Sequence, residues 1–354
     1  MPGIYIGSTT AYAGKNLMAL GLGLTLQKHG YRVGYMKPIG TLPVKKEGKP
    51  GDEDALFVQA MLGLEDDPVD ITPVVVDQDV MVKAFSGRNE DVVPRIEDAY
   101  ARLSQDKDVM IVGGSGNMFS SASFGLDSMT LVKRLGLKTL VIDRCTKELH
   151  YDYLAVIRNL LGDHCMGIVL NDVSASLMSE VKTVFLPFLE RLGIHVLGVI
   201  PSDPLLGSIQ VQEVCERLGG QVITAQDRQD RLVGHFLIGT MQAENFITHF
   251  TKSRRSAVLV GGDRSDIHQV ALEGQCECLI MTGNLYPSDM IITRAHALGI
   301  PLVVVRDDTY TVARKMEDIL ARSRLRGTTR VHHGAERVAS LVDIMAIKER
   351  IGLG

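Results

Sequence analysis

The side chain with the clearest chemical role near the start of the chain is Lys15, which follows Gly14 at the end of a loop of small residues. A short apolar strand precedes this loop, and a helix is expected to begin at Lys15. Such a loop directs several backbone N–H groups toward one point, and the helix N-terminus adds a partial positive charge. The lysine supplies a full charge where a phosphate would lie. The segment therefore predicts a nucleotide phosphate cradle; the alternative is an ordinary β–α turn that contains Gly and Lys.

The spacing around Lys15 departs from the common pattern of a glycine, four residues, Gly-Lys and then Ser or Thr. Thr9 stands where the first glycine is expected, and Asn16 follows Lys15. A hydroxyl after the lysine would touch the metal ion, and an amide is a poorer ligand for Mg²⁺. We therefore expect a P-loop architecture that binds a nucleotide, and we expect binding more than catalysis.

Three further features lie beside predicted strand or helix ends. Lys37 follows the strand over residues 31–36, at the edge where doubly wound sheets bind ligands; a solvated strand-end lysine is the alternative. Asp54 stands in the first turn of a helix, which favours either N-terminal capping or a metal-facing role. The glycine-rich residues 113–116 follow the strand over 108–112 and indicate either close approach of the backbone to a ligand or a flexible turn.

The order of elements predicts an α/β protein. Strands alternate with helices through residue 201, which is typical of a doubly wound parallel sheet, here of the P-loop NTPase type. A smaller α/β domain with its own core follows. The expected division is residues 1–205, residues 206–325 and a C-terminal helical tail over 326–354, whose apolar stripe is typical of packing or of an oligomer contact.

Some local predictions are more specific. Residues 41–50 are expected to form a polar loop and residues 68–91 an extended, loop-like segment with one short strand. The helix over residues 180–192 is expected to bend near Pro187.

Composition excludes several classes of protein. A net charge of −4 and a pI near 6.2 argue against a general nucleic-acid binder. No apolar run approaches the length of a membrane span, and the first strand leaves no room for a secretion signal, so a cytoplasmic protein is expected. The five cysteines are expected to be reduced thiols; the pair Cys276 and Cys278 has no second pair to complete a zinc site.

The motifs, taken together and in order, resemble those of known families. The first two hundred residues resemble the dethiobiotin synthetase-like branch of P-loop proteins, and the whole chain is similar to the non-catalytic N-terminal part of bacterial long-form phosphotransacetylases. The second domain resembles the domain named for its Asp-Arg-Thr-Gly-Gly motif. The matching segments are residues 7–15, 37–39, 54–55, 113–116, 169–172 and 198–201 for the first domain and residues 261–266 and 307–309 for the second.

The resemblance implies roles for particular residues. Gly14 and Lys15 would hold phosphates, Asn171 would read the base and Asp54 would approach a metal ion. The full set of expected nucleotide-binding residues is Thr9, Thr10, Ala13, Gly14, Lys15, Asn16, Lys37 and Asn171.

This chain departs from the synthetases at two positions. They have Thr where this chain has Asn16, and they place a metal-binding Glu where it has Gly113. Two of the three expected Mg²⁺ contacts are therefore missing, a loss that affects phosphoryl transfer more than binding. The Asp263/Arg264 pair is expected to form either an anion site or a structural pair that holds a turn.

Three functions follow as hypotheses. The first is a regulatory protein that binds ATP, another nucleotide or a different small anionic ligand, and that works as a homo-oligomer with an acetate-metabolism enzyme as partner. The second is an ATP-dependent carboxylate-activating ligase of the dethiobiotin or cobyrinate type, suggested by Lys15, Lys37 and Asp54. The third is a structural assembly module with a vestigial pocket.

Overall fold

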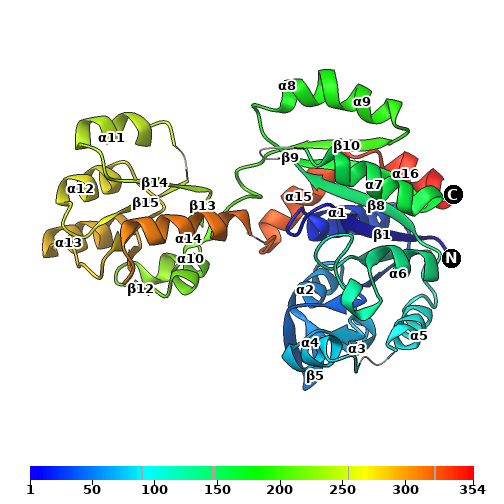
Figure 1. Ribbon diagram of the computed structural model, residues 1–354. Helices are drawn as coiled ribbons and strands as arrows, with labels where there is room; N and C mark the ends of the chain where they lie inside the picture. The colour runs from blue at the N-terminus through cyan, green and yellow to red at the C-terminus, as the bar shows by residue number, and fades with distance from the viewer. Residues whose placement is uncertain (89–90, 146–148, 254, 323) are drawn as a thin grey trace. The chain divides into compact units, whose positions relative to one another are not determined.

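The chain forms two compact units in the computed structural model (Figure 1), which describes residues 1–88, 91–145, 149–253, 255–322 and 324–354. The first unit contains residues 1–202 together with 325–354, and the second unit contains residues 203–324. The sequence placed residues 326–354 in a separate tail, whereas their contacts group them with the first unit. Helices at the two ends of the chain account for this difference.

The main sheet of the first unit is parallel throughout and has the strand order β10-β9-β8-β1-β7-β2. Its central strands are near-continuous apolar runs that are buried on both faces, as a parallel sheet covered by helices requires. This arrangement confirms the predicted doubly wound sheet. The strands are β1 (Gly3–Ser8), β2 (Val33–Met36), β7 (Val109–Gly113), β8 (Lys138–Arg144), β9 (Cys165–Val173) and β10 (Val196–Pro201).

Helices cover both faces of this sheet. One face packs α6 (Ser128–Arg134) and α7 (Tyr151–Leu161) over Val112, Val141 and Ile168 in a buried apolar cluster. The first helix, α1 (Lys15–Lys28), packs against β1, β2 and β7. Smaller elements of this unit are α2 (Glu53–Met61), α3 (Pro68–Ile71), α4 (Gln78–Phe85), α5 (Val93–Leu103), α8 (Met178–Glu180) and α9 (Leu186–Arg191).

The C-terminal segment folds back onto the helix that follows the Lys15 loop. It forms α15 (Thr328–Leu341) and α16 (Ile344–Ile351), and α15 lies beside α1 (Figure 1). Gly21 of α1 makes this contact close, because a Cβ at that position would lie 2.4 Å from Cβ of Val338. The apolar stripe that the sequence assigned to packing or to an oligomer therefore includes Val338, which is fully buried within the unit.

Several local predictions need correction. The expected polar loop contains a hairpin of β4 (Pro43–Lys46) and β5 (Lys49–Asp52). The segment over residues 68–91 contains α3 and α4 in addition to the short strand β6 (Val74–Val75), which pairs with β3 (Ile39–Gly40). Aspartates that cap both helices, Asp67 and Asp77, were the missed signal. The helix predicted over residues 180–192 is interrupted near Pro187, because a π-helical turn over Val181–Phe185 precedes α9.

The second unit is a smaller three-layer α/β structure. Its sheet has the order β12-β17-β16-β15-β14, with only β12 antiparallel. Alternate residues of β15 serve two cores: Ala257 and Leu259 face one cluster, and Val258 and Val260 face the other. The strands are β12 (Gln221–Val222), β14 (His235–Ile238), β15 (Ser256–Gly261), β16 (Cys278–Thr282) and β17 (Leu302–Val304), beside a short pair of β11 (Ile209–Gln210) and β13 (Leu232–Val233).

The helices of the second unit lie on the two faces of this sheet. One cluster contains residues of α10 (Val211–Leu218) and α14 (Thr309–Ala321). The other contains residues of α11 (Ala243–Phe250), α12 (Ser265–Glu273) and α13 (Asp289–Leu298). The second unit is thus an α/β domain, as predicted, and its core consists of two apolar clusters, one on each face of the sheet.

Four of the five cysteines are buried, and Cys165 is partly buried. All five cysteines are free thiols, and burial raises the pKa of Cys276 to about 12 and the pKa of Cys278 well above its usual value. Within the described ranges no group of three His, Cys, Asp or Glu side chains could hold a metal ion. The helices that the structure describes include none with the length and apolar character needed to cross a bilayer.

The contact at Gly21 can be tested by stability. We expect Gly21→Ala to lower the free energy of unfolding by about 1–3 kcal/mol, because the added methyl group overpacks the α1–α15 contact. In chemical denaturation, the cost of Gly21→Ala should be smaller in a Val338→Ala background, where room has been made. A Gly21→Ala variant that is more stable than the wild type, as helix propensity alone would give, contradicts this packing.

Candidate functional site

Lys15 is held over the carboxyl ends of two central strands. Its Nζ donates hydrogen bonds to Ser8 Oγ at 2.9 Å and to the carbonyl oxygen of Gly116. Ser8 ends β1, and Gly116 follows shortly after β7, the strand paired with it. The loop and the first turn of α1 therefore present the ammonium group and free helical N–H groups at one place, as anion binding requires.

Gly14 has a backbone conformation that glycine adopts most readily. It is the N-cap of α1 with φ of 103°. Asn171, at the end of β9, donates from Nδ2 to the carbonyl oxygen of Ala13 at 2.8 Å. A Cβ at Gly14 would lie 2.3 Å from this nitrogen, so the asparagine supports the loop from beneath. Its predicted role in reading a base remains a prediction, whereas its contact with the loop was not foreseen.

Thr9 is anchored by a buried carboxylate. Its hydroxyl donates to Asp143 Oδ1, and Asp143 is fully buried at the end of β8. His150 contacts the same carboxylate through Nδ1, at 2.9 Å, and through its backbone N–H, at 3.2 Å. Thr9 therefore serves the loop through an anchored hydroxyl, whereas Thr10 accepts from Ser8 Oγ through its backbone carbonyl at 2.7 Å.

Lys37 is buried, which rules out the solvated strand-end lysine that the sequence left open. Its Nζ lies 2.7 Å from Asp52 Oδ1, and the two side chains are only 7% and 0% exposed. Asp52 also caps α2 by accepting from the backbone N–H of Ala55, and its other oxygen accepts from Thr41 and Leu42. Each charge of this pair is therefore compensated, as buried charges must be.

Asp54 lies against an arginine from the far end of the chain. Its Oδ1 is 2.6 Å from a guanidinium nitrogen of Arg326, which also lies 3.0 Å from Glu53 Oε1. Lys37 Nζ is 3.9 Å from the other Asp54 oxygen. The predicted metal-facing aspartate is thus surrounded by two cations of the protein itself.

The charges of this region influence one another. Burial, together with the nearby charge of Lys37, lowers the pKa of Lys15 to about 8, although the charge of Asp54 opposes the shift. Burial, with the charges of Asp52 and Asp54, raises the pKa of Tyr35 well above its usual value, so its phenol is neutral. Lys37 and Asp54 therefore lie close enough to Lys15 for their charges to change its pKa.

The donors present do not suit the Mg²⁺ ion that the P-loop architecture implies. Asn16 offers an amide in the first turn of α1, where a hydroxyl is needed. Position 113 has no side chain, and a Cβ there would lie 2.8 Å from Tyr35 Oη, which fills the space of an acidic group. The carboxylate of Asp54 is already paired with Arg326. None of the three positions offers an uncompensated anionic oxygen.

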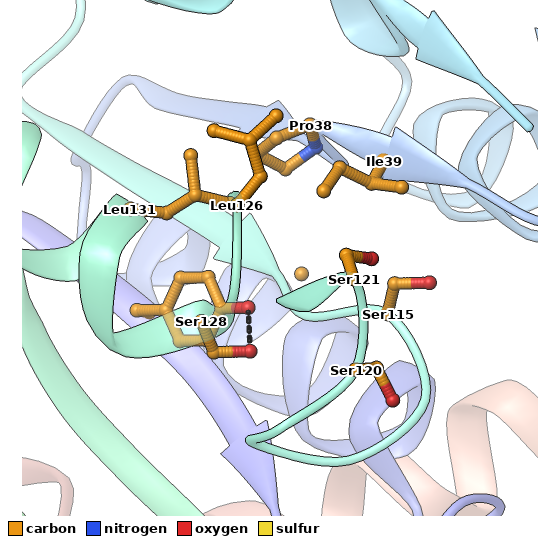
Figure 2. A pocket seen from close by; sticks show the side chains of 10 residues that line it. Pro38, Ile39, Ser115, Ser120, Ser121, Leu126, Ser128 and Leu131 are labelled. Atoms are coloured by element: carbon orange, nitrogen blue, oxygen red, sulfur yellow. Dashed lines mark hydrogen bonds between the residues drawn. The ribbon is translucent and has the colours of Figure 1, made fainter. Parts of the chain in front are cut away.

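A small cavity lies behind the glycine-rich strand end, beside the loop (Figure 2). Hydroxyl groups of Ser115, Ser120 and Ser121 lie on one side of it and Leu126 and Leu131 on the other, while Tyr5 Oη donates to Ser128 Oγ at 2.7 Å. Its volume of about 10 Å³ suits one water molecule and not a nucleotide. The cavity is therefore not a nucleotide site, and none of its lining residues belongs to the loop that contains the exposed Tyr12.

The structure brings the predicted residues of the first unit into one neighbourhood. Thr9, Thr10, Ala13, Gly14, Lys15 and Asn16 form the loop and the first helical turn; Asn171 touches the loop, and Lys37 and Asp54 act on it through charge. Sequence reasoning missed Ser8, Asp143, Asp52 and Arg326. A signal existed for Asp143, which ends an apolar strand, and for Asp52, which precedes a helix; none existed for Arg326.

The Asp263/Arg264 motif of the second unit proves structural in its arginine. The guanidinium of Arg264 makes two hydrogen bonds of 2.9 Å to Asp266 and a third to the carbonyl oxygen of Met241. The pairing residue is therefore Asp266 rather than Asp263. The arginine therefore links the start of α12 to the segment that precedes α11.

Removing the carboxylate of Asp52 tests the buried pair. We expect Asp52→Ala to cost about 3–5 kcal/mol in the free energy of unfolding, because the buried Lys37 charge loses its close partner and keeps only Asp54, 3.9 Å away. The matched control is Glu273→Ala, which breaks an exposed pair with Arg294 and should cost less than about 1 kcal/mol. Equal costs in denaturant titrations of the two variants would contradict the assignment.

Comparison with known proteins agrees with these features. A family model described as an AAA domain matches residues 2–210, and one described as a DRTGG domain matches residues 213–319. The chain is 25% identical to a phosphate acetyltransferase of Synechocystis sp., over 89% of this chain and 47% of that protein. It is 27% identical to an ATP-dependent dethiobiotin synthetase of Methanocaldococcus jannaschii, over 56% of this chain and 94% of that protein.

The structure also matches the septum site-determining protein MinD of Pyrococcus horikoshii, solved with Mg-ADP, at 15% identity and a TM-score of 0.35, over 58% of this chain and 83% of that one. The chain spans about half the length of the phosphate acetyltransferases that it matches. The predicted resemblance to dethiobiotin synthetases, phosphotransacetylases and the DRTGG domain is confirmed. Because the first family model covers more than half of its residues, the chain belongs to the AAA-domain family, with a DRTGG domain following.

Proposed function

We propose that this chain binds a nucleotide at the Lys15 loop and acts as a regulatory, ligand-sensing protein related to the non-catalytic N-terminal part of phosphotransacetylases. The observation that carries the proposal is the position of Lys15 Nζ, held between Ser8 and Gly116 at the N-terminus of α1. A desolvated ammonium beside free helical N–H groups favours a phosphate over a neutral ligand.

The same site argues for sensing rather than catalysis. Phosphoryl transfer depends on a metal ion that bridges phosphate oxygens and neutralises the developing charge. With Asn16 and Gly113, the chain lacks two side chains that would contact such an ion, and the carboxylate of Asp54 is paired with Arg326. Binding needs only the loop and its cations, and these are retained. The DRTGG domain that follows would then pass the ligand state to a partner.

A ligase is the second candidate. An ATP-dependent dethiobiotin synthetase matches 56% of this chain over 94% of its own length, and Lys15 and Lys37 are the residues that would bind ATP phosphates in such an enzyme. An enzyme of this type would release ADP and phosphate from ATP with Mg²⁺ when given a carboxylate and an amine or CO₂ acceptor. The absence of any release across such a panel, from protein that binds ATP, would favour the regulatory role.

The partners belong to the same proposal. A regulatory unit of this kind would form a homo-oligomer in the cytoplasm and work with an enzyme of acetate metabolism, as the relation to phosphotransacetylases suggests. Neither nucleic acid nor membrane is part of the proposed function.

Calorimetric titration tests the binding site directly. We expect ATP, ADP or GTP to bind the wild type, and Lys15→Ala to weaken the binding by at least about tenfold, because a charge-assisted bond to phosphate is lost. Lys28→Ala, an exposed lysine in the last turn of the same helix, is the matched control and should leave affinity unchanged. The proposal fails if none of the nucleotides binds.

The pKa of Lys15 predicts how binding responds to pH. A lysine with a lowered pKa, here about 8, loses its charge as the pH rises through that value. The affinity for nucleotide should therefore fall roughly tenfold between about pH 7.5 and about pH 9, over which phosphates stay ionised. The residual affinity of Lys15→Ala should not change over this interval. A flat profile in the wild type would exclude Lys15 as the phosphate-binding cation.

A further inference from the structure

Arg326 is held against the first turn of α2 by several contacts. Its side chain is only 21% exposed, and its guanidinium lies 4.7 Å from the centre of the Phe57 ring, a distance typical of a cation–π contact. The same group lies within hydrogen-bond distance of both acidic residues in the first turn of α2, Glu53 and Asp54. The arginine therefore stacks on α2 and compensates its acidic end.

The main chain around Arg326 is held as firmly as its side chain. The carbonyl oxygen of Arg326 accepts from Arg330 Nε at 2.6 Å, and Gly327, with φ of 80°, turns the chain into α15. Helix α15 then packs on α1 through the Val338–Gly21 contact. Because α1 begins at Lys15, one helix pair sets the positions of both the phosphate-loop lysine and the arginine.

Acidic side chains near the Lys15 loop are paired with cations of the protein itself. Uncompensated carboxylates beside a phosphate site repel the ligand unless a divalent cation lies between them. In this chain Asp54 and Glu53 are compensated by Arg326, Asp52 by Lys37, and position 113 has no carboxylate. The further acid at this loop, Asp143, is buried and held by Thr9 and His150.

We propose that Arg326 takes the place of Mg²⁺ at this site, so that the Lys15 loop binds a polyphosphate anion without a divalent metal. The inference rests on the proposed function only for the identity of the anion as a nucleotide. Arg326 is paired permanently with Asp54 and also contacts the more exposed Glu53, whereas a metal would lie beside these carboxylates only when bound. The site therefore does not require a metal ion on its ligand.

The experiment compares affinities for ATP and for inorganic tripolyphosphate in EDTA and in excess Mg²⁺. The wild type should bind with affinities that agree within about threefold in the two conditions. In Arg326→Ala the released carboxylates should weaken binding about tenfold or more in EDTA, and Mg²⁺ should restore much of the loss. Adding Asp54→Asn to Arg326→Ala should remove most of this new metal dependence.

Three controls keep the result interpretable. Arg95→Ala removes an exposed arginine of α5 and should behave as the wild type in both conditions. Arg326→Lys keeps the charge and should retain most of the affinity in EDTA. Asp54→Asn alone leaves the arginine in place, so it tests the account even where Arg326→Ala does not fold; its affinity in EDTA should equal or exceed that of the wild type.

The outcomes separate this inference from the proposed function. Wild-type binding that is lost in EDTA, or is lost in Asp54→Asn, overturns the inference while a nucleotide site stands. Metal-independent binding of tripolyphosphate without binding of any nucleotide supports the inference and overturns the nucleotide assignment. No binding of either anion overturns both. Equal affinities of Arg326→Ala and wild type in EDTA remove the role of Arg326.

Discussion

The hydrogen bonds of Lys15 to Ser8 and Gly116 are the interaction on which the rest of the site depends. They connect the first residue of α1 to the end of β1 and to the segment that follows β7. The Lys15 loop therefore cannot open without losing a charge-assisted hydrogen bond. Asn171 and Asp143 then support the loop from two further strands, through Ala13 and Thr9. Four adjacent strands of the six-stranded sheet, β9, β8, β1 and β7, thus hold the proposed anion cradle in place.

Under the proposed function, the same sheet allows binding to be kept where catalysis is lost. The cradle is built from backbone groups and one lysine, which tolerate changes elsewhere in the sequence. Metal-assisted chemistry needs particular side chains at separate strand and helix ends. One substitution is enough to remove any of these metal contacts. Here Asn16 replaces a hydroxyl, and Tyr35 fills the space beside Gly113. The cradle persists where those groups are gone.

Sequence reasoning found the parts of the site that are continuous in the chain. The loop over residues 7–16, the strand-end Lys37 and the alternation of strands and helices in a parallel sheet follow from local patterns of apolar, small and charged residues, and the structure has them. The residues that support the loop escaped because their partners are distant: Asp143 meets Thr9 across 134 positions and Arg326 meets Asp54 across 272. Asp54 was read as a metal ligand because its own turn contains no sign of the arginine. The helix over Gln78–Phe85 and the β4–β5 hairpin were missed because their polar residues resemble those of loops.

The most direct test of a phosphate cradle without a metal is a crystal structure of the protein grown with ATP and Mn²⁺, with anomalous diffraction recorded at the manganese edge. Our account predicts phosphate oxygens at Lys15 and the N-terminus of α1, Arg326 still paired with Asp54, and no anomalous peak between them. A peak for an ion coordinated by Asp54 and the triphosphate, with Arg326 displaced, would contradict it.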